Sequence, residues 1–283
     1  MRLLAMNNRF GLHIRLIESL FDAAARAERL NITMFQAVLM LETREFLQMP
    51  DEDIERFVQL RREKFEHLFV HGAYWSNVTN VTGRGFHSLL KEIELAEKLE
   101  FTHIVIHPGS FGTDMTRNHR VNYIAKSIDT LLQATKNIII VLENSPHKDK
   151  SFSSSIEEFG DLCKKISQCG RVKICIDTAH AFVAGYDIST PEKVDVFVKL
   201  LADTIGISNI GLLHCNDTKK NCGSFLDVHA VPGHGKIGMA ALYRFVHHPL
   251  LDKIPVVFEM PALDESLEYD IIQQFRDMEV LEL

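Results

Sequence analysis

Six residues that can bind metal ions recur along the chain, each at the end of a short apolar segment. Successive members are 34 to 45 residues apart: His71, His107, Glu143, Asp177, His214 and Glu259. Three more candidates, His180, Asp227 and His229, lie in segments expected to be loops. Imidazole and carboxylate ligands suit zinc or manganese better than a metal that prefers thiolates. The nine residues predict metal-dependent chemistry, with Glu143, Asp177 and Glu259 as the candidate catalytic carboxylates.

Taken singly, each residue has a plainer interpretation. A histidine at a strand end is more often a hydrogen-bonded core group, and a buried carboxylate can pair with an arginine. Six such residues at six consecutive segment ends are better explained together, because buried charges are rarely unpaired and one cation cluster satisfies them all. The remaining histidines, His13 included, are expected on the surface or behind the ligands, and His67 and His103 at strand starts or in lower layers.

Eight β-rich segments must position these residues, and each is followed by an amphipathic stretch. Apolar residues recur at helical spacing in Leu89-Ile93-Ala96-Leu99. Ile138 to Leu142 is apolar without alternation, which is typical of a parallel strand buried on both faces. Eight such units predict an α/β protein, a (β/α)₈ TIM barrel forming a single domain over residues 1–283, whose C-terminal strand ends meet at one mouth. The segments are 10–14, 32–39, 67–74, 102–108, 137–144, 172–178, 209–216 and 254–260.

An open doubly wound sheet is the alternative fold, but its glycine-rich turn is missing after the first segment, which continues as His13-Ile14-Arg15-Leu16. With 46% hydrophobic and 24% charged residues, the composition is that of an ordinary globular protein. The apolar runs are too short for a membrane span or a signal peptide, and the five cysteines form no CxxC pair, so we expect free thiols and a cytoplasmic protein. A net charge of -7 argues against a nucleic-acid partner unless bound metal supplies local positive charge.

Three motifs in the chain resemble those of the endonuclease IV family of apurinic/apyrimidinic endonucleases. The first is His71-Gly72-Ala73-Tyr74, the second runs from Cys175 through Asp177 and His180 to Asp187, and the third runs from His214 through Asp227 and His229 to Gly235. The resemblance covers nearly the whole chain and implies a TIM barrel with three zinc ions. By motif, these would be held by His71, His107 and Glu143; by Glu143, Asp177, His214 and Glu259; and by His180, Asp227 and His229.

The resemblance also implies an activity. Such enzymes act in base excision repair, where they cut double-stranded DNA 5′ to an abasic site, and family analogy suggests a monomer. The metals neutralise the phosphate and lower the pKa of a bound water toward roughly 7. Manganese or iron is possible at some sites. Tyr74 matches the position of a side chain that is inserted into DNA when the lesion is flipped out.

The chain departs from the family pattern at several places and is therefore identified as a divergent member. Residues 37–42, before Arg44, replace a DNA-reading loop that usually carries Lys-Asn and Arg ahead of a Trp. Phe225 and Val228 stand where the family has arginines. Four lysines are candidates to compensate for the lost cations: Lys148, Lys150, Lys219 and Lys220.

Two other functions are weighed against this one. A sugar isomerase or epimerase on the related xylose-isomerase-like barrel would use one or two metals and would leave His180, Asp227 and His229 without a role. A lesion-binding protein without turnover would keep the metals and bind DNA without cleaving it.

Overall fold

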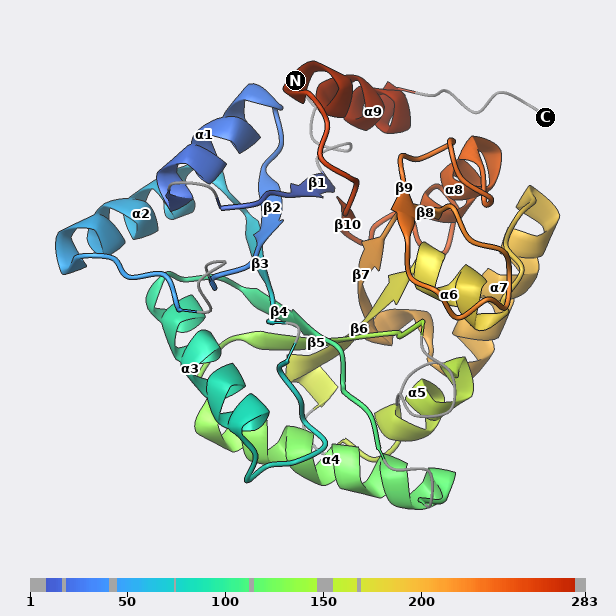
Figure 1. Cartoon of the computed structure of the whole chain (residues 1–283), viewed down its shortest axis with the longest axis horizontal. Coiled ribbons are helices and arrows are strands. Elements are labelled where there is room, and N and C mark those ends of the chain that lie inside the picture. The colour runs from blue at the N-terminus through green and yellow to red at the C-terminus, as the bar shows by residue number, and fades with distance from the viewer. Residues whose placement is uncertain are drawn as a thin grey trace.

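Eight parallel strands form a closed barrel in this computed structural model, which describes residues 9–16, 19–40, 45–73, 75–111, 115–146, 155–166 and 169–277. The order around the barrel is β1-β10-β7-β6-β5-β4-β3-β2, and helices surround it (Figure 1). This arrangement confirms the TIM barrel and rules out the open sheet. The strands are β1 (Phe10–His13), β2 (Met34–Ala37), β3 (His67–His71), β4 (His103–Ile106), β5 (Ile139–Glu143), β6 (Val172–Asp177), β7 (Ile210–His214) and β10 (Val256–Phe258).

The helices follow from local sequence signals. The Thr190 side chain accepts a hydrogen bond from the Lys193 amide, and Pro191 occupies the first turn of α7, as capping preferences expect. The buried face of α3 contains Leu89, Ile93 and Ala96 of the apolar pattern seen in the sequence, and Leu99 directly follows the helix. The helices are α1 (Leu20–Arg29), α2 (Asp51–Lys64), α3 (Arg84–Lys98), α4 (Arg117–Ala134), α5 (Ile156–Cys163), α6 (Thr178–Ala184), α7 (Pro191–Thr204), α8 (Met239–Val246) and α9 (Glu265–Asp277). Within the described ranges, no helix is long and apolar enough to cross a membrane.

The barrel interior is filled by one layer of buried side chains from seven strands. These are Met34, Phe69, Val105, Val141, Cys175, Leu212 and Val257. On β1 the corresponding residue is Gly11, where a Cβ atom would come within 2.7 Å of the Met34 carbonyl oxygen. Side chains alternate along a strand, so the next inward-facing layer lies two residues further on, toward the mouth.

Two elements near the mouth differ from the sequence prediction. His180 lies in the short helix α6 and not in a loop. The third motif forms an antiparallel hairpin of β8 (Asp217–Thr218) and β9 (His229–Ala230), so His229 lies in a strand. The buried Asp217 carboxylate fixes the segment after this hairpin by accepting hydrogen bonds from the amides of Gly233, Gly235 and Ile237 at 2.9–3.0 Å.

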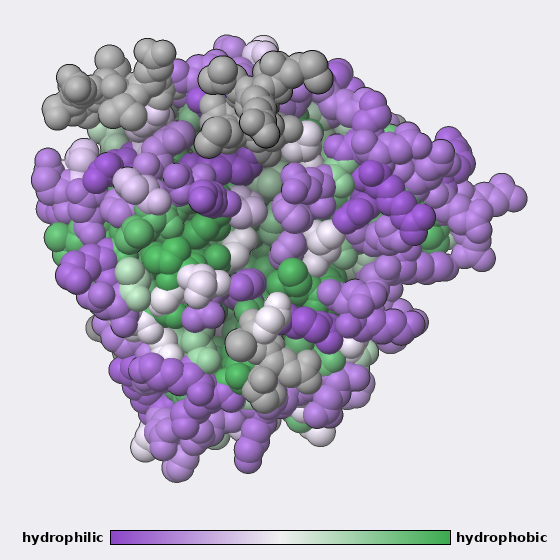
Figure 2. Space-filling model, turned by 180° about the vertical axis from the view of Figure 1, so that it is seen from behind, coloured by the Kyte–Doolittle hydropathy of each residue, from purple (hydrophilic) through white to green (hydrophobic). Residues whose placement is uncertain are grey.

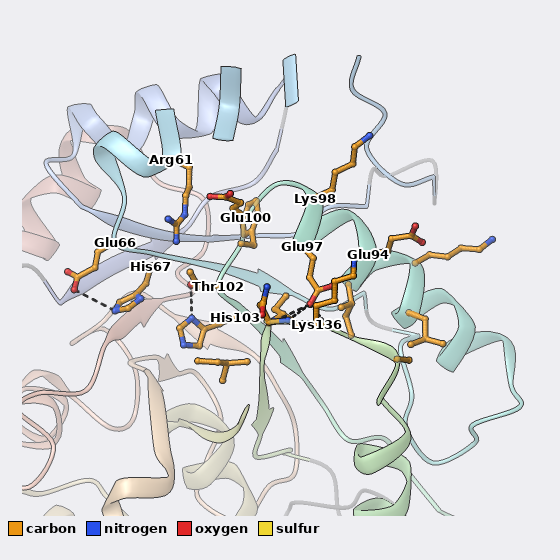
Figure 3. A pocket seen from close by; sticks show the side chains of 18 residues that line it. Arg61, Glu66, His67, Glu94, Glu97, Lys98, Glu100, Thr102, His103 and Lys136 are labelled. Atoms are coloured by element: carbon orange, nitrogen blue, oxygen red, sulfur yellow. Dashed lines mark hydrogen bonds and ion pairs between the residues drawn. The ribbon is translucent and has the colours of Figure 1, made fainter. Parts of the chain in front are cut away.

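The opposite end of the barrel holds a cavity of about 1040 Å³ at the starts of β3, β4 and β5. His67 and His103 are the first residues of β3 and β4, as predicted, and they lie at the wall of this cavity with ring centroids 5.5 Å apart (Figure 3). His103 stacks on Phe69 at 4.6 Å, and its Nδ1 contacts the Thr102 hydroxyl at 2.7 Å. Seen from behind, the molecule is mostly hydrophilic at its outline, and hydrophobic residues show in the hollows between polar side chains (Figure 2). The cavity at the starts of β3, β4 and β5 contains none of the predicted metal ligands.

Candidate metal centre

The mouth of the barrel presents one polar side chain from every strand. Each of these residues stands two positions after a residue of the interior layer, which brings residues from the whole length of the chain to one level. The eight are His13, Gln36, His71, His107, Glu143, Asp177, His214 and Glu259. His107 and Glu259 directly follow their strands, and the other four predicted members are the last residues of theirs. The layer therefore contains all six of the predicted strand-end residues.

Glu143 is the centre of this layer and is fully buried. One carboxylate oxygen lies 3.3 Å from His71 Nε2 and 3.4 Å from His107 Nε2. The other lies 3.0 Å from His214 Nδ1 and 3.2 Å from His180 Nδ1. The two oxygens thus face two different sets of histidines, as expected of a carboxylate placed between two cations.

The first two predicted ligand groups are brought together. Ligand atoms of His71, His107 and Glu143 all lie within 4.8 Å of one another. The same limit holds for the group of Glu143, Asp177, His214 and Glu259. Glu259 Oε2 lies 3.2 Å from His214 Nδ1.

The third group forms beside the layer, where α6 meets the β8–β9 hairpin. Asp227 lies between two histidines, with one oxygen 3.3 Å from His180 Nε2 and the other 3.2 Å from His229 Nε2. Ligand atoms of Asp177, His180 and His229 also lie within 4.8 Å of one another. Asp177 accepts a hydrogen bond from the His180 amide at 2.8 Å, so it caps α6 and fixes the start of the helix that carries His180.

Three of the histidines are oriented by the main chain. The Nδ1 atoms of His71, His180 and His229 each lie 3.0 Å from a carbonyl oxygen, that of Gly72, Asn144 and Glu259 respectively. A histidine that donates Nδ1–H presents a bare Nε2, the usual arrangement of a metal-binding imidazole. The Nε2 atoms of His180 and His229 are buried and have no hydrogen-bond partner. Orphaned nitrogens facing a carboxylate fit a divalent cation.

Gln36 fixes the ring of His214, a role that was not predicted from the sequence. Its Nε2 contacts Glu259 Oε1 at 2.6 Å, and its Oε1 contacts His214 Nε2 at 3.0 Å. Because an ionised carboxylate only accepts, the NH₂ group must face Glu259, so Oε1 accepts from His214 Nε2–H. The bare Nδ1 of His214 then faces the oxygens of Glu143 and Glu259, and such an arrangement needs a cation. The available signal was one amide side chain inside the apolar run that extends from residue 34 to residue 39.

Asn216 was quoted in the third motif, but no role was predicted for it. Its Nδ2 donates to Asp177 at 2.5 Å and to Glu259 at 3.2 Å, while its Oδ1 accepts the Glu259 amide at 2.8 Å. It therefore holds two predicted ligands at a fixed separation.

The protonation equilibria show how strongly this site favours positive charge. Burial alone would raise the pKa of Glu143, but His107 and His214 outweigh it, and the pKa lies well below the usual range. Burial alone would lower the pKa of His229, but the Asp227 carboxylate, 3.2 Å from Nε2, raises it to about 9. Burial raises the pKa of the Cys175 thiol to about 12, so this neighbouring sulfur stays protonated and is a poor ligand. The histidines and carboxylates are left as the cation-binding groups.

These groups line a cavity of about 850 Å³ that opens at the mouth. Trp75 lines it and is 40% exposed. Around Asp227, the side chains of Leu226 and Val228 are 54% and 38% exposed, so the positions next to this ligand present apolar surface. Tyr74, Arg44, Lys148 and Lys150 lie outside the described residues.

Comparison with known proteins agrees with this geometry. The family described as "Xylose isomerase-like TIM barrel" matches residues 17–276. A protein of Thermosipho africanus named "Probable endonuclease 4" is 32% identical over 81% of this chain and 84% of its own length. The "Apurinic-apyrimidinic endonuclease" of Caenorhabditis elegans is 33% identical over 75% of this chain and 56% of its own length. Among solved structures, endonuclease IV from Thermus thermophilus superposes with a TM-score of 0.80 at 22% identity, covering 94% of this chain and 98% of the other, which shows a shared fold.

Proposed function

The chain belongs to the endonuclease 4 family of xylose isomerase-like TIM barrels, and on that premise we propose that it is a zinc-dependent endonuclease that cuts double-stranded DNA 5′ to abasic sites. The observation that carries the proposal is the third group. Asp227 lies within 3.3 Å of two buried imidazole nitrogens that have no hydrogen-bond partner, directly beside the Glu143 cluster. Three adjacent cation sites suit a negatively charged phosphodiester better than a neutral sugar.

We assign the proposed ions as the motifs imply. His71, His107 and Glu143 would hold the first, and Glu143, Asp177, His214 and Glu259 the second. His180, Asp227 and His229 would hold the third, with Asp177 close enough to share in it. When bound, zinc neutralises phosphate charge and lowers the pKa of a water molecule toward neutrality, so that hydrolysis needs no amino-acid nucleophile.

The residues of the chain have three tasks in this scheme. Glu143, Asp177 and Glu259 supply the negative charge that retains the cations. The carbonyl oxygens behind His71, His180 and His229 fix the ring orientations. Gln36 fixes the ring of His214, and Asn216 holds Asp177 and Glu259 at a fixed separation, so that the cluster is organised before the substrate arrives.

The test is elemental analysis of protein purified without chelator, together with cleavage of a duplex that carries one abasic-site analogue. About three zinc ions per chain and incision 5′ to the lesion would establish the proposal. One or two ions without incision would favour the sugar isomerase or epimerase, which neither sequence relative supports by name. Three ions with binding but no incision would identify a lesion-binding protein. We also infer that residues 1–283 act as a single-domain monomer in the cytoplasm.

A further inference from the structure

The eighth position of the mouth layer belongs to β1, and no part of the proposed metal centre uses it. His13 occupies this position, on the wall of the same cavity as His71, His229 and Glu259. Its side chain is 20% exposed, and its ring centroid lies 6.2 Å from that of His71. His13 was expected on the surface or behind the ligands, and in the structure it lies beside the proposed ligand Glu259, with Nδ1 3.5 Å from Glu259 Oε1.

The ring of His13 is held in one orientation by Gln36. The Gln36 NH₂ group, already identified by its contact with Glu259, also lies 2.9 Å from His13 Nδ1. This contact is shorter than the 3.5 Å between His13 Nδ1 and Glu259 Oε1, so we take Nδ1 to accept from Gln36 and the ring hydrogen to reside on Nε2. Within the described residues, Nε2 has no partner in the protein, so it offers the cavity a hydrogen-bond donor of fixed direction.

Arg15 follows on the same strand edge. The chain continues beside β2 after β1 ends, since the Ile14 amide donates to the Gln36 carbonyl at 2.7 Å. Two residues beyond His13 on this extended backbone, Arg15 lines the same cavity, is exposed, and forms no ion pair with any described residue. Among the described residues that line this cavity, it is the only lysine or arginine.

The surroundings make this cation significant for a nucleic-acid substrate. The chain carries a net charge of -7, and Phe225 and Val228 supply no cation beside the third group. Lys219 and Lys220, considered earlier as compensating cations, do not line the cavity. Phosphate binding draws on arginine and on neutral hydrogen-bond donors alike.

We propose that the end of β1 is a DNA-phosphate contact strip, in which Arg15 pairs with a backbone phosphate and His13 donates Nε2–H to a phosphate oxygen. This inference rests on the proposed endonuclease function. It assigns two binding residues outside the ligand set, and it predicts that they act on substrate affinity more than on metal content.

The test for Arg15 compares wild type, Arg15→Gln and Lys136→Gln on a duplex with one abasic-site analogue at several KCl concentrations. Lys136 is exposed at the opposite end of the barrel (Figure 3), so its variant is a control for the loss of one positive charge. Removing one phosphate contact should flatten the plot of log(kcat/KM) against log[KCl] by about 0.9. We expect this change, with KM raised about 3- to 10-fold and kcat retained, for Arg15→Gln only. Equal slopes in all three proteins would overturn the role of Arg15.

The test for His13 uses two amide variants. His13→Gln can place an NH₂ donor near the position of Nε2, whereas His13→Asn keeps an acceptor near Nδ1 and loses that donor. We expect a KM near the wild-type value for His13→Gln and a KM raised several-fold for His13→Asn, with unchanged zinc content in both. The reverse order, or zinc loss in both, would show that His13 only supports Gln36.

Failure of the strip and failure of the endonuclease function give different results. A wild-type protein that cuts the duplex, with variants that show unchanged salt dependence, overturns the strip alone. If wild type does not cut, the endonuclease proposal fails. The same salt series, read by fluorescence anisotropy of the labelled duplex, then decides the strip: an unchanged slope in Arg15→Gln, or no binding by wild type, overturns it.

Discussion

The histidines of the site are held by two different devices. His71, His180 and His229 are oriented by carbonyl oxygens, which no side-chain substitution removes. His214 depends on the Gln36 side chain. We therefore expect the orientation of His214, unlike that of the other three histidines, to be lost when a neighbouring side chain is replaced.

Loss of a histidine from the third group should remove one metal and most of the activity. We expect His180→Ala to retain about two ions per chain and to lower kcat at least about 100-fold, because the charge that develops on the phosphate would be less well stabilised. Elemental analysis and steady-state cleavage measure both quantities. His67→Ala, at the opposite end of the barrel, is the matched control and should keep both. Full activity with two ions in His180→Ala would contradict the three-metal proposal.

Replacing Gln36 should weaken metal binding without removing a ligand. Gln36→Leu leaves His214 free to rotate, so we expect affinity at the second group to fall about 10- to 100-fold. Competition with a chromogenic chelator measures this affinity. Met34→Leu, two residues earlier in the same strand, controls for repacking inside the barrel. An equal loss in both variants would trace the effect to packing.

Glu92 gives the free energy of unfolding a pH dependence of its own. This side chain of α3 is buried, accepts the Ala73 amide at 3.0 Å, and has its pKa raised by burial from 4.5 to about 7. Because the pKa is raised, the contribution of Glu92 to the free energy of unfolding is fully present below about pH 4.5 and is lost as pH rises through about 7. Between pH 5 and pH 8, the free energy of unfolding of Glu92→Gln should therefore rise by about 2–3 kcal/mol relative to that of wild type. Urea unfolding at both pH values tests this, with exposed Glu94→Gln as the control. A constant difference between the two proteins would contradict it.

At the scale of elements, the repeat of strand and helix made most of the site predictable. Residues that end buried strands must meet at the mouth of a parallel barrel, and His71, Glu143 and Asp177 follow that rule without any contact being known. Gln36 follows it too, but a side-chain amide is not one of the usual zinc ligands, so Gln36 was not noticed. His13 was noticed, but a single histidine at the end of a strand carries little information without the rest of the layer.

The elements outside the regular repeat were less predictable. Helix α6 has seven residues, which is too short for an apolar period, and its start is capped by Asp177, a residue already assigned to the metal site. The β8–β9 hairpin pairs only two residues per strand, with Gly-rich sequence after it. Their positions depend on long-range contacts: the amides of Gly223 and Phe225 donate to the Phe182 and Val183 carbonyls of α6.

The Asp217 carboxylate should be important for the stability of this region. It accepts hydrogen bonds from four amides of the segment after β9, those of Gly233, Gly235, Ile237 and Gly238, and a Cβ atom on Gly235 would lie 2.2 Å from it. In Asp217→Asn one oxygen becomes an NH₂ group that faces N–H donors, so we expect a loss of about 3 kcal/mol in the free energy of unfolding. Urea unfolding measures it. Asp203→Asn, whose exposed carboxylate pairs with Lys199, should change stability by less than about 1 kcal/mol. Equal losses of stability in the two variants would show that the hydrogen bonds accepted by the Asp217 carboxylate are not needed for stability.

At the scale of the whole molecule, metal binding and folding should be linked. The ligands come from six barrel strands, helix α6 and the hairpin, and in the metal-free protein the carboxylates of Glu143, Asp177 and Glu259 lie close together in the interior. We expect chelation to abolish cleavage and to lower Tm by at least about 5 °C, because ions that bind only the folded state stabilise it. Differential scanning calorimetry with and without chelator, followed by zinc addition, tests this. An unchanged Tm would indicate that the barrel does not retain the ions.

The closure of the barrel has a consequence during synthesis of the chain. β1 pairs with β10, and Glu259 directly follows β10. The pairing of β1 is therefore complete only after β10 has been synthesised. A ribosome that has made His71, Glu143 and His214 has still not made the residue that completes their cluster. Nascent or prematurely terminated chains therefore lack the assembled centre. A protein proposed to cut the genome of its own cell would acquire that ability only when translation of the barrel is finished.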